Sequence, residues 1–175
     1  MSEKIPSIYL DACPIIDMAQ EKAGVALAPG IPQSVWLCTE ALRASRDKKA
    51  RVFTSFLSIA ECTSVAEGVT SPPDDVKRFF DMLLLSGKSG IELVSITQAI
   101  AIRARSLRWV SGVNLKGADT VHVATAMAMK CDELWTRDGR IYKNREKISQ
   151  LGLNVVQPDA SAVLPDQYRG LRLIL

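Results

Sequence analysis

The sequence predicts an α/β protein of three layers, in which a mainly parallel sheet of four to five strands lies between two layers of helices. Short apolar runs of strand length alternate along the chain with longer stretches of helical periodicity. The 175 residues, 47% hydrophobic and 23% charged, have globular composition. We therefore expect a single domain over residues 1–175, with an irregular tail from about residue 158.

Five apolar runs are the predicted strands. The first, Ser7-Ile8-Tyr9-Leu10, lacks polar alternation at its centre, which is typical of a strand buried on both faces of the sheet. The predicted strands cover residues 7–10, 51–55, 91–95, 133–136 and 154–156.

Helical periodicity marks most segments between these strands. Pro14 and the pair Asp74-Asp75 stand where helices are predicted to begin, because prolines and acidic residues are favoured in first turns. The predicted helices cover residues 14–22, 35–46, 58–67, 72–85, 97–110, 117–129 and 142–150. Residues 24–33 hold two prolines and two glycines and predict a loop.

The charge and cysteine content narrow the functional classes. A net charge of +3 is compatible with a polyanionic partner without requiring one. The four cysteines are scattered and there is one histidine, which argues against a zinc cluster. No stretch approaches the ~20 apolar residues of a membrane span. We expect a cytoplasmic protein with reduced thiols.

Four carboxylates stand at strand ends or helix starts. Asp11 and Asp138 follow predicted strands, whereas Glu61 and Asp119 fall in the first turns of helices. The carboxyl ends of parallel strands meet at one edge of a sheet, so these acids can converge there. Carboxylate oxygens are the ligands that Mg²⁺ and Mn²⁺ prefer.

Each acid also has a purely structural interpretation. Asp11 can cap a helix, and Ser58-Ile59-Ala60-Glu61 fits a capping box. Asp119 can complement a helix dipole, and Asp138-Gly139 is a common turn pair. Singly, these interpretations are the more common ones. The joint, ordered arrangement of four acids favours a site.

Four short stretches carry a resemblance to a known family. They are Ile8-Tyr9-Leu10-Asp11, Ser58-Ile59-Ala60-Glu61, Gly117-Ala118-Asp119-Thr120-Val121-His122-Val123-Ala124-Thr125-Ala126 and Leu134-Trp135-Thr136-Arg137-Asp138. In this order, over about residues 5–157, the chain resembles the PIN-domain family, especially the VapC-like toxins of toxin–antitoxin pairs. It departs in having Cys13 where many relatives place Asn, Ser or Thr, and in a longer segment over residues 21–50.

The resemblance implies a PIN-like fold and a Mg²⁺- or Mn²⁺-dependent endoribonuclease that cleaves single-stranded RNA, as the toxin of a type II toxin–antitoxin pair. Asp11, Glu61, Asp119 and Asp138 would be the catalytic, metal-binding acids, with Thr136 as a supporting hydroxyl. The implied partners are RNA, a small antitoxin that covers the acidic pocket, and a second copy of the chain in a homodimer. The alternative is a PIN-like module that binds RNA or protein without cutting.

Weaker signals surround these acids. Arg137 and Arg140 flank Asp138 and are placed to meet a substrate phosphate. His122, one turn after Asp119, is predicted to have a structural role within a buried stripe. A metal-free ribonuclease with paired histidines is excluded, because His122 is the only histidine.

Three further groups of residues leave two interpretations open. One basic set either lines a path for a phosphate backbone or forms a solvated helix face, and it comprises Arg103, Arg105, Arg108 and Lys116. The tryptophans Trp36, Trp109 and Trp135 either pack in a core or interface, which is the default, or stack on bases. The apolar tail over residues 171–175 belongs either to a dimer interface or to the packing of its own domain.

Overall fold

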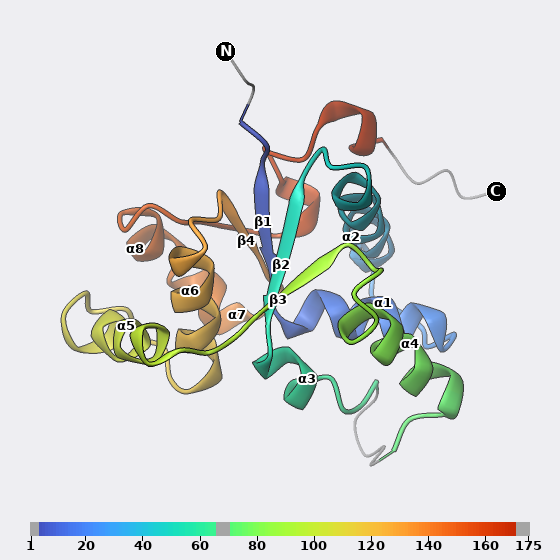
Figure 1. Ribbon diagram of the computed structural model, residues 1–175, viewed down its shortest axis with the longest axis horizontal. Coiled ribbons are helices and arrows are strands. Elements are labelled where there is room, and N and C mark those ends of the chain that lie inside the picture. Colours follow the sequence, from blue (N-terminus) through green and yellow to red (C-terminus); the bar gives the residue numbers. More distant parts are fainter. Residues whose placement is uncertain (1–3, 66–70, 171–175) are drawn as a thin grey trace.

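The computed structural model describes residues 4–65 and 71–170. Its centre is a five-stranded sheet in the order β3-β2-β1-β4-β5, and every neighbouring pair is parallel (Figure 1). The strands are β1 (Ser7–Leu10), β2 (Arg51–Ser55), β3 (Ile91–Val94), β4 (Glu133–Trp135) and β5 (Asn154–Val156). The predicted α/β class with a parallel sheet is confirmed, as are all five predicted strands.

Helices cover both faces of this sheet (Figure 1). One side carries α1 (Ala12–Lys22), α2 (Ile31–Arg46) and α4 (Asp74–Leu84). The other side carries α5 (Gln98–Trp109), α6 (Ala118–Ala128), α7 (Gly139–Lys143) and α8 (Arg145–Ser149). The short α3 (Leu57–Glu61) lies beyond the carboxyl ends of the strands.

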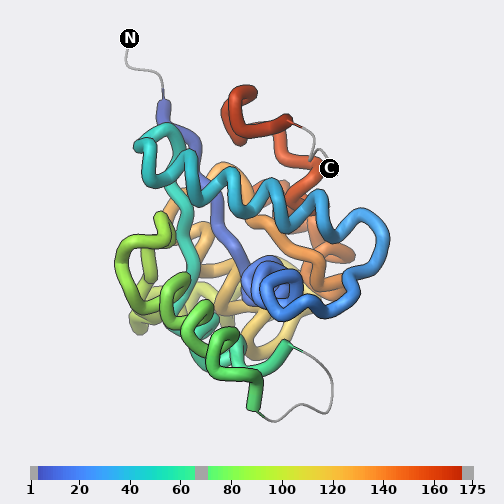
Figure 2. Tube along the Cα trace, turned by 90° about the vertical axis from the view of Figure 1, so that its right-hand side faces the viewer, coloured from blue at the N-terminus to red at the C-terminus, as the bar shows by residue number. Residues whose placement is uncertain are grey.

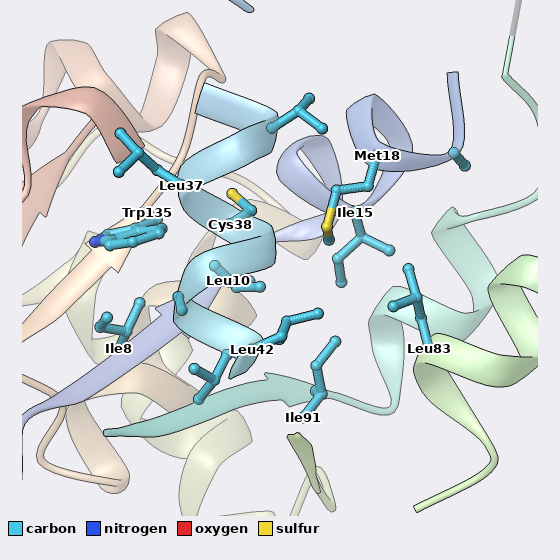
Figure 3. Close-up of a cluster of buried hydrophobic side chains, with 14 of the residues drawn as sticks. Ile8, Leu10, Ile15, Met18, Leu37, Cys38, Leu42, Leu83, Ile91 and Trp135 are labelled. Carbon is cyan, nitrogen blue, oxygen red and sulfur yellow. The ribbon is translucent and has the colours of Figure 1, made fainter. Parts of the chain in front are cut away.

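Alternate residues of β1 divide the core into two layers. Ile8 and Leu10 point into the cluster built with α1, α2 and α4, where Trp135 also packs (Figure 3). Tyr9 points into the opposite cluster, against α5 and α6. All four side chains are fully buried. A strand flanked by helices on both faces has to be apolar on both faces, which explains why β1 shows no alternation of polar and apolar residues.

Three helices differ clearly from their predicted bounds. The helix expected at residues 35–46 already begins at Ile31, since Pro32 is tolerated in a first turn. The predicted loop over residues 24–33 is therefore shorter. The helix expected at residues 142–150 is split into α7 and α8 at Asn144, whose side-chain oxygen accepts a hydrogen bond from the Asn114 amide at 3.0 Å. The helix expected at 58–67 ends at Glu61, and residues 66 and 67 lie outside the described residues.

The segment after β5 runs back along α2 (Figure 2). Where an irregular tail was expected, it contains two 3₁₀ turns, η1 (Pro158–Ala160) and η2 (Asp166–Tyr168). The Tyr168 hydroxyl donates to the Asp47 carboxylate at 2.7 Å, and the Arg43 guanidinium lies 5.0 Å from the Tyr168 ring centroid. The tail over residues 171–175, for which an interface role was expected, lies outside the described residues.

Among the helices of residues 4–65 and 71–170, none combines the length and apolar character that crossing a membrane requires. The four cysteines form no disulfide, and Cys38, Cys62 and Cys131 are buried.

Candidate functional site

The order of the strands reverses at β1, which has β2 on one side and β4 on the other. Chain crossovers from neighbouring strands diverge at such a position and leave a crevice beyond the carboxyl ends of the two strands, where ligands of α/β proteins commonly bind. Asp11 directly follows β1, and Thr136 directly follows β4. The Asp11 amide donates to the Trp135 carbonyl at 3.2 Å, so these two strand ends are held side by side.

Asp11 is a buried carboxylate, 2% exposed. One of its oxygens accepts a hydrogen bond from the Thr136 hydroxyl, and the other accepts from the Cys13 amide at 2.8 Å and caps α1. Burial raises the pKa of Asp11 to about 7, although the hydrogen bonds from Thr136 and Cys13 oppose the shift. Asp11 therefore caps α1, as its structural interpretation predicted, and at the same time its burial disfavours the charged form of its carboxyl.

Thr136 connects Asp11 to Asp138. Its hydroxyl donates to Asp11 and accepts from the Asp138 amide at 2.8 Å. Asp138 in turn caps α7 by accepting from the Arg140 amide at 2.6 Å. The hydrogen bond from the Arg140 side chain is the main cause that lowers the pKa of Asp138. The two strand-end acids thus share one threonine and differ in their tendency to ionise.

Arg140 bridges two of the acids. Its Nη2 lies 2.8 Å from an Asp138 oxygen and 3.3 Å from an Asp119 oxygen, while 72% of the Arg140 side chain is exposed. Asp119 comes from the first turn of α6 and is buried. Burial raises the pKa of Asp119 even though Arg140 opposes the shift. One exposed cation therefore neutralises carboxylates from two different elements.

Glu61 reaches the same region from α3. Its Oε2 lies 2.6 Å from Nε2 of His122, which is one helical turn beyond Asp119 on α6. Nδ1 of His122 lies 2.9 Å from the Tyr9 hydroxyl, whose pKa is raised by burial. With Glu61 ionised, Nε2 donates to it, and Nδ1 accepts from the Tyr9 hydroxyl. This buried chain holds Glu61 beside Asp119.

The capping-box interpretation of Ser58 to Glu61 is wrong. No side chain caps α3, and the Ser58 hydroxyl lies 2.6 Å from the Thr54 hydroxyl, which donates to the Leu10 carbonyl at 2.7 Å. The Glu61 carboxylate contacts His122. Ser58 therefore ties α3 to the sheet, and the Glu61 carboxylate remains available to the site.

The four predicted acids lie at one edge of the sheet, and each is within electrostatic range of at least one other. The carboxyl of Asp11 interacts with Asp138, and that of Asp119 interacts with both Asp138 and Glu61. Among the described residues, however, no group of three or more His, Cys, Asp or Glu side chains is arranged around one point as metal ligands. Arg140, Thr136 and His122 hold the carboxylates separately.

The donor chemistry of these residues nevertheless fits a hard divalent cation. Four carboxylates and one hydroxyl offer oxygen ligands, the kind that Mg²⁺ and Mn²⁺ bind. Two of the acids, Asp11 and Asp119, have pKa values raised by burial, so a nearby cation would favour their ionised forms. Since 72% of the Arg140 side chain is exposed, it competes for these oxygens from the solvent side.

Two contacts in this region had no signal in the sequence. Arg137, predicted to meet a substrate phosphate, has both Nε and Nη2 on the carboxylate of Asp17, a buried residue of α1. That pair joins the turn after β4 to α1, and 28% of the Arg137 side chain is exposed. The predicted burial of His122 is confirmed, but its contact with Glu61 was missed, because 61 positions separate the partners.

A family model described as the PIN domain matches residues 38–147 of the chain. The matched region contains Glu61, Asp119 and Asp138, while Asp11 lies before it. A comparison with curated proteins found no match.

Proposed function

This chain belongs to the PIN-domain family, whose members are generally metal-dependent nucleases, and we propose that it is a Mg²⁺- or Mn²⁺-dependent endoribonuclease acting on single-stranded RNA. The observation that carries the proposal is the gathering of Asp11, Glu61, Asp119 and Asp138 at the strand-order reversal, where α/β proteins bind ligands. Carboxylates of like charge gathered at one edge of the sheet repel one another, and a bound cation would offset that repulsion.

Each residue has a distinct role in this proposal. Asp11, Asp119 and Asp138 would be the metal ligands, and Glu61 would be a further ligand or would hold a water of the ion. A bound divalent cation supplies Lewis-acid stabilisation of the phosphate and activates water. Thr136 orients Asp11 through its hydrogen bond, and His122 orients Glu61. Arg140 turns from the acids toward a non-bridging phosphate oxygen, for which its exposure and planar guanidinium suit it.

The proposal extends to the role of a toxin in a type II toxin–antitoxin pair, on the basis of the resemblance to VapC-like toxins. A small antitoxin then covers the acidic edge of the sheet, and the toxin forms a homodimer. Induced expression of the wild-type chain is expected to arrest bacterial growth, and the Asp119→Asn variant is expected to permit it. Equal growth of the two strains would remove the toxin role and leave the nuclease proposal intact.

The test of the nuclease activity uses labelled single-stranded RNA with Mn²⁺ or with EDTA, and the wild type beside Asp119→Asn. We expect cleavage only by the wild type with Mn²⁺, and a loss of at least ~100-fold in the variant, as for other residues that stabilise charge in a transition state. Glu146→Gln, which changes an exposed acid of α8, is the matched control and should retain activity. Equal cleavage by the wild type and Asp119→Asn would show a contaminating nuclease.

The alternative is a PIN-like module that binds RNA or protein without cutting. It is favoured by the contacts of Arg140, which neutralises Asp119 and Asp138 without any metal. Thermal unfolding in the presence of Mn²⁺ separates the two functions. A ligand that binds only the folded state raises the melting temperature, so a nuclease shows a shift that Asp119→Asn reduces, whereas a binding module shows none.

A further inference from the structure

We propose that a hollow between the end of α5 and the start of α6 binds the single-stranded RNA substrate, with phosphates on Arg105, Arg108 and Lys116 and a base stacked on Trp109. The hollow has a volume of about 320 Å³. It deepens the proposed function, since it assumes that the acid site cuts RNA.

The position of the hollow connects it to the acids. Its lining includes Gly117, which precedes α6, and Thr120, while Asp119 lies between these two residues on the first turn of that helix. An RNA strand bound in the hollow would therefore contact the same first turn of α6 that carries Asp119.

The charge of the hollow suits a polyanion. Arg105, Arg108 and Lys116 are all exposed and line it together. Among the ion pairs of residues 4–65 and 71–170, none involves these three cations. In contrast, Arg137 and Arg140 are already paired with acids. Exposed cations without acidic partners are available to bind phosphates, and their binding releases counterions.

Trp109 is the second, independent observation. It is the last residue of α5 and 72% exposed, whereas Trp135 is fully buried. The Arg105 guanidinium lies 4.7 Å from the centroid of the Trp109 ring, so a cation covers one part of an exposed aromatic surface. Aromatic rings among cations are typical of sites that bind single strands, because every base has a face that can stack.

The helix itself divides the basic residues into two sets. Arg105, Arg108 and Trp109 are spaced by three and four positions and share one face of α5. Arg103 lines a different hollow, together with Met127 and Leu151. The structure thus separates Arg103 from the basic set that the sequence had grouped, and it makes Arg103 a matched control on the same helix.

The experiment measures binding of a labelled single-stranded RNA of about ten nucleotides, a length within the site sizes of proteins that bind single strands. The protein is the full chain carrying Asp119→Asn, in EDTA, so that cleavage does not consume the probe. Fluorescence anisotropy gives the dissociation constant across a salt series. A DNA oligonucleotide of the same sequence tests whether the hollow prefers RNA.

We expect Trp109→Ala to weaken binding about tenfold with an unchanged salt dependence, because it removes a stacked base and no charge. The double variant Arg105→Ala and Arg108→Ala should reduce the slope of log affinity against log salt by about 0.7 for each lost phosphate contact. Arg103→Ala should change the affinity less than twofold. Tryptophan fluorescence should fall on RNA binding and should fall less in Trp109→Phe.

Three results would overturn the proposal: unchanged binding in the Trp109 and arginine variants, equal weakening by Arg103→Ala, or an effect of Trp109→Ala only on the oligomeric state. If these variants bind RNA as tightly as the protein without them, while the wild type still cuts it with Mn²⁺, the nuclease proposal stands and RNA binds elsewhere than in the hollow. If the variants behave as expected and the wild type never cuts, the hollow stands and the nuclease proposal fails.

Discussion

Asp11 shows how one residue can serve both the fold and the site. As a cap, it satisfies an amide of α1, and as an acceptor from Thr136 it joins the ends of β1 and β4. Its burial disfavours the charged form, so the pKa rises to about 7. In the metal-free protein, folding therefore works against ionisation of this carboxyl at neutral pH.

This linkage predicts that Asp11→Asn is more stable than the wild type in EDTA, by a margin that grows with pH. The pKa of Asp11 is near the ordinary aspartate value of 3.8 in the unfolded chain and about 7 in the folded chain, so between these values the folded state binds more protons. The free energy of unfolding of the wild type accordingly falls as the pH rises through this range. The asparagine side chain of the variant does not titrate, so its stability lacks this dependence on pH.

Urea unfolding of both proteins between about pH 4 and pH 8 measures the margin. All other titratable groups are common to both proteins, so their contributions cancel in the difference between the two free energies of unfolding. A margin that does not change with pH would mean that Asp11 ionises freely in the folded protein. With Mn²⁺ the order should reverse, because the cation stabilises only a site that retains the carboxylate.

At the scale of elements, the contact between the end of α2 and the start of β3 depends on one glycine. Gly90 has a φ of +96°, and a Cβ there would lie 2.6 Å from the Leu42 carbonyl oxygen. The Ser45 hydroxyl donates to the Gly90 carbonyl at 2.6 Å. The helix backbone can approach the strand this closely only because residue 90 has no side chain.

Gly90→Ala is expected to lower the free energy of unfolding by about 3 kcal/mol, as the sum of left-handed backbone strain and a clash with a helix carbonyl. Gly87→Ala is the control, because its φ is +66° and a Cβ there meets nothing within 4 Å. It should cost only about 1 kcal/mol. The difference between the urea midpoints of the two variants measures the cost of the clash alone. Equal losses of stability in both would show that α2 moves aside.

At the scale of the whole molecule, Glu133 ties the segment after β5 to the sheet. It is 2% exposed, and its carboxylate accepts from Trp135 Nε1 at 2.8 Å, the Ser161 hydroxyl at 2.7 Å and the Ala162 amide at 2.9 Å. These donors come from β4 and from the segment that runs along α2. The hydrogen-bonded, buried Glu133 carboxylate is therefore a structural link between β4 and the segment after β5.

Glu133→Ala should lower the free energy of unfolding by about 3 kcal/mol, because it leaves the buried Trp135 donor and the two part-buried donors of Ser161 and Ala162 without their acceptor. Glu133→Gln retains one oxygen and should lose less. Glu146→Ala, at an exposed position of α8, should change stability by less than about 0.5 kcal/mol. Urea unfolding of these variants measures the link, and a wild-type value for Glu133→Ala would show that water replaces the carboxylate.

Local pattern was sufficient to predict the five strands, whereas several helix bounds were wrong. Buried parallel strands have to be apolar on both faces, so β1, β2 and β5 were predicted with their observed bounds. The start of α2 was missed because its first turn lies in a stretch rich in proline and glycine, a composition that is also typical of loops. The roles of Asp11, Glu61, Asp119 and Asp138 in metal binding stay predictions.

The sequence by itself determined the α/β class, the order of strands along the chain and the membership of the PIN-domain family, because periodicity and short motifs are local properties. Only the tertiary structure decided which distant residues meet. The contacts of Glu61 with His122, Asp17 with Arg137, and Arg140 with Asp119 each depend on how the elements pack in space. Such contacts join positions that no local pattern relates, and packing against the sheet is what brings them within hydrogen-bond distance.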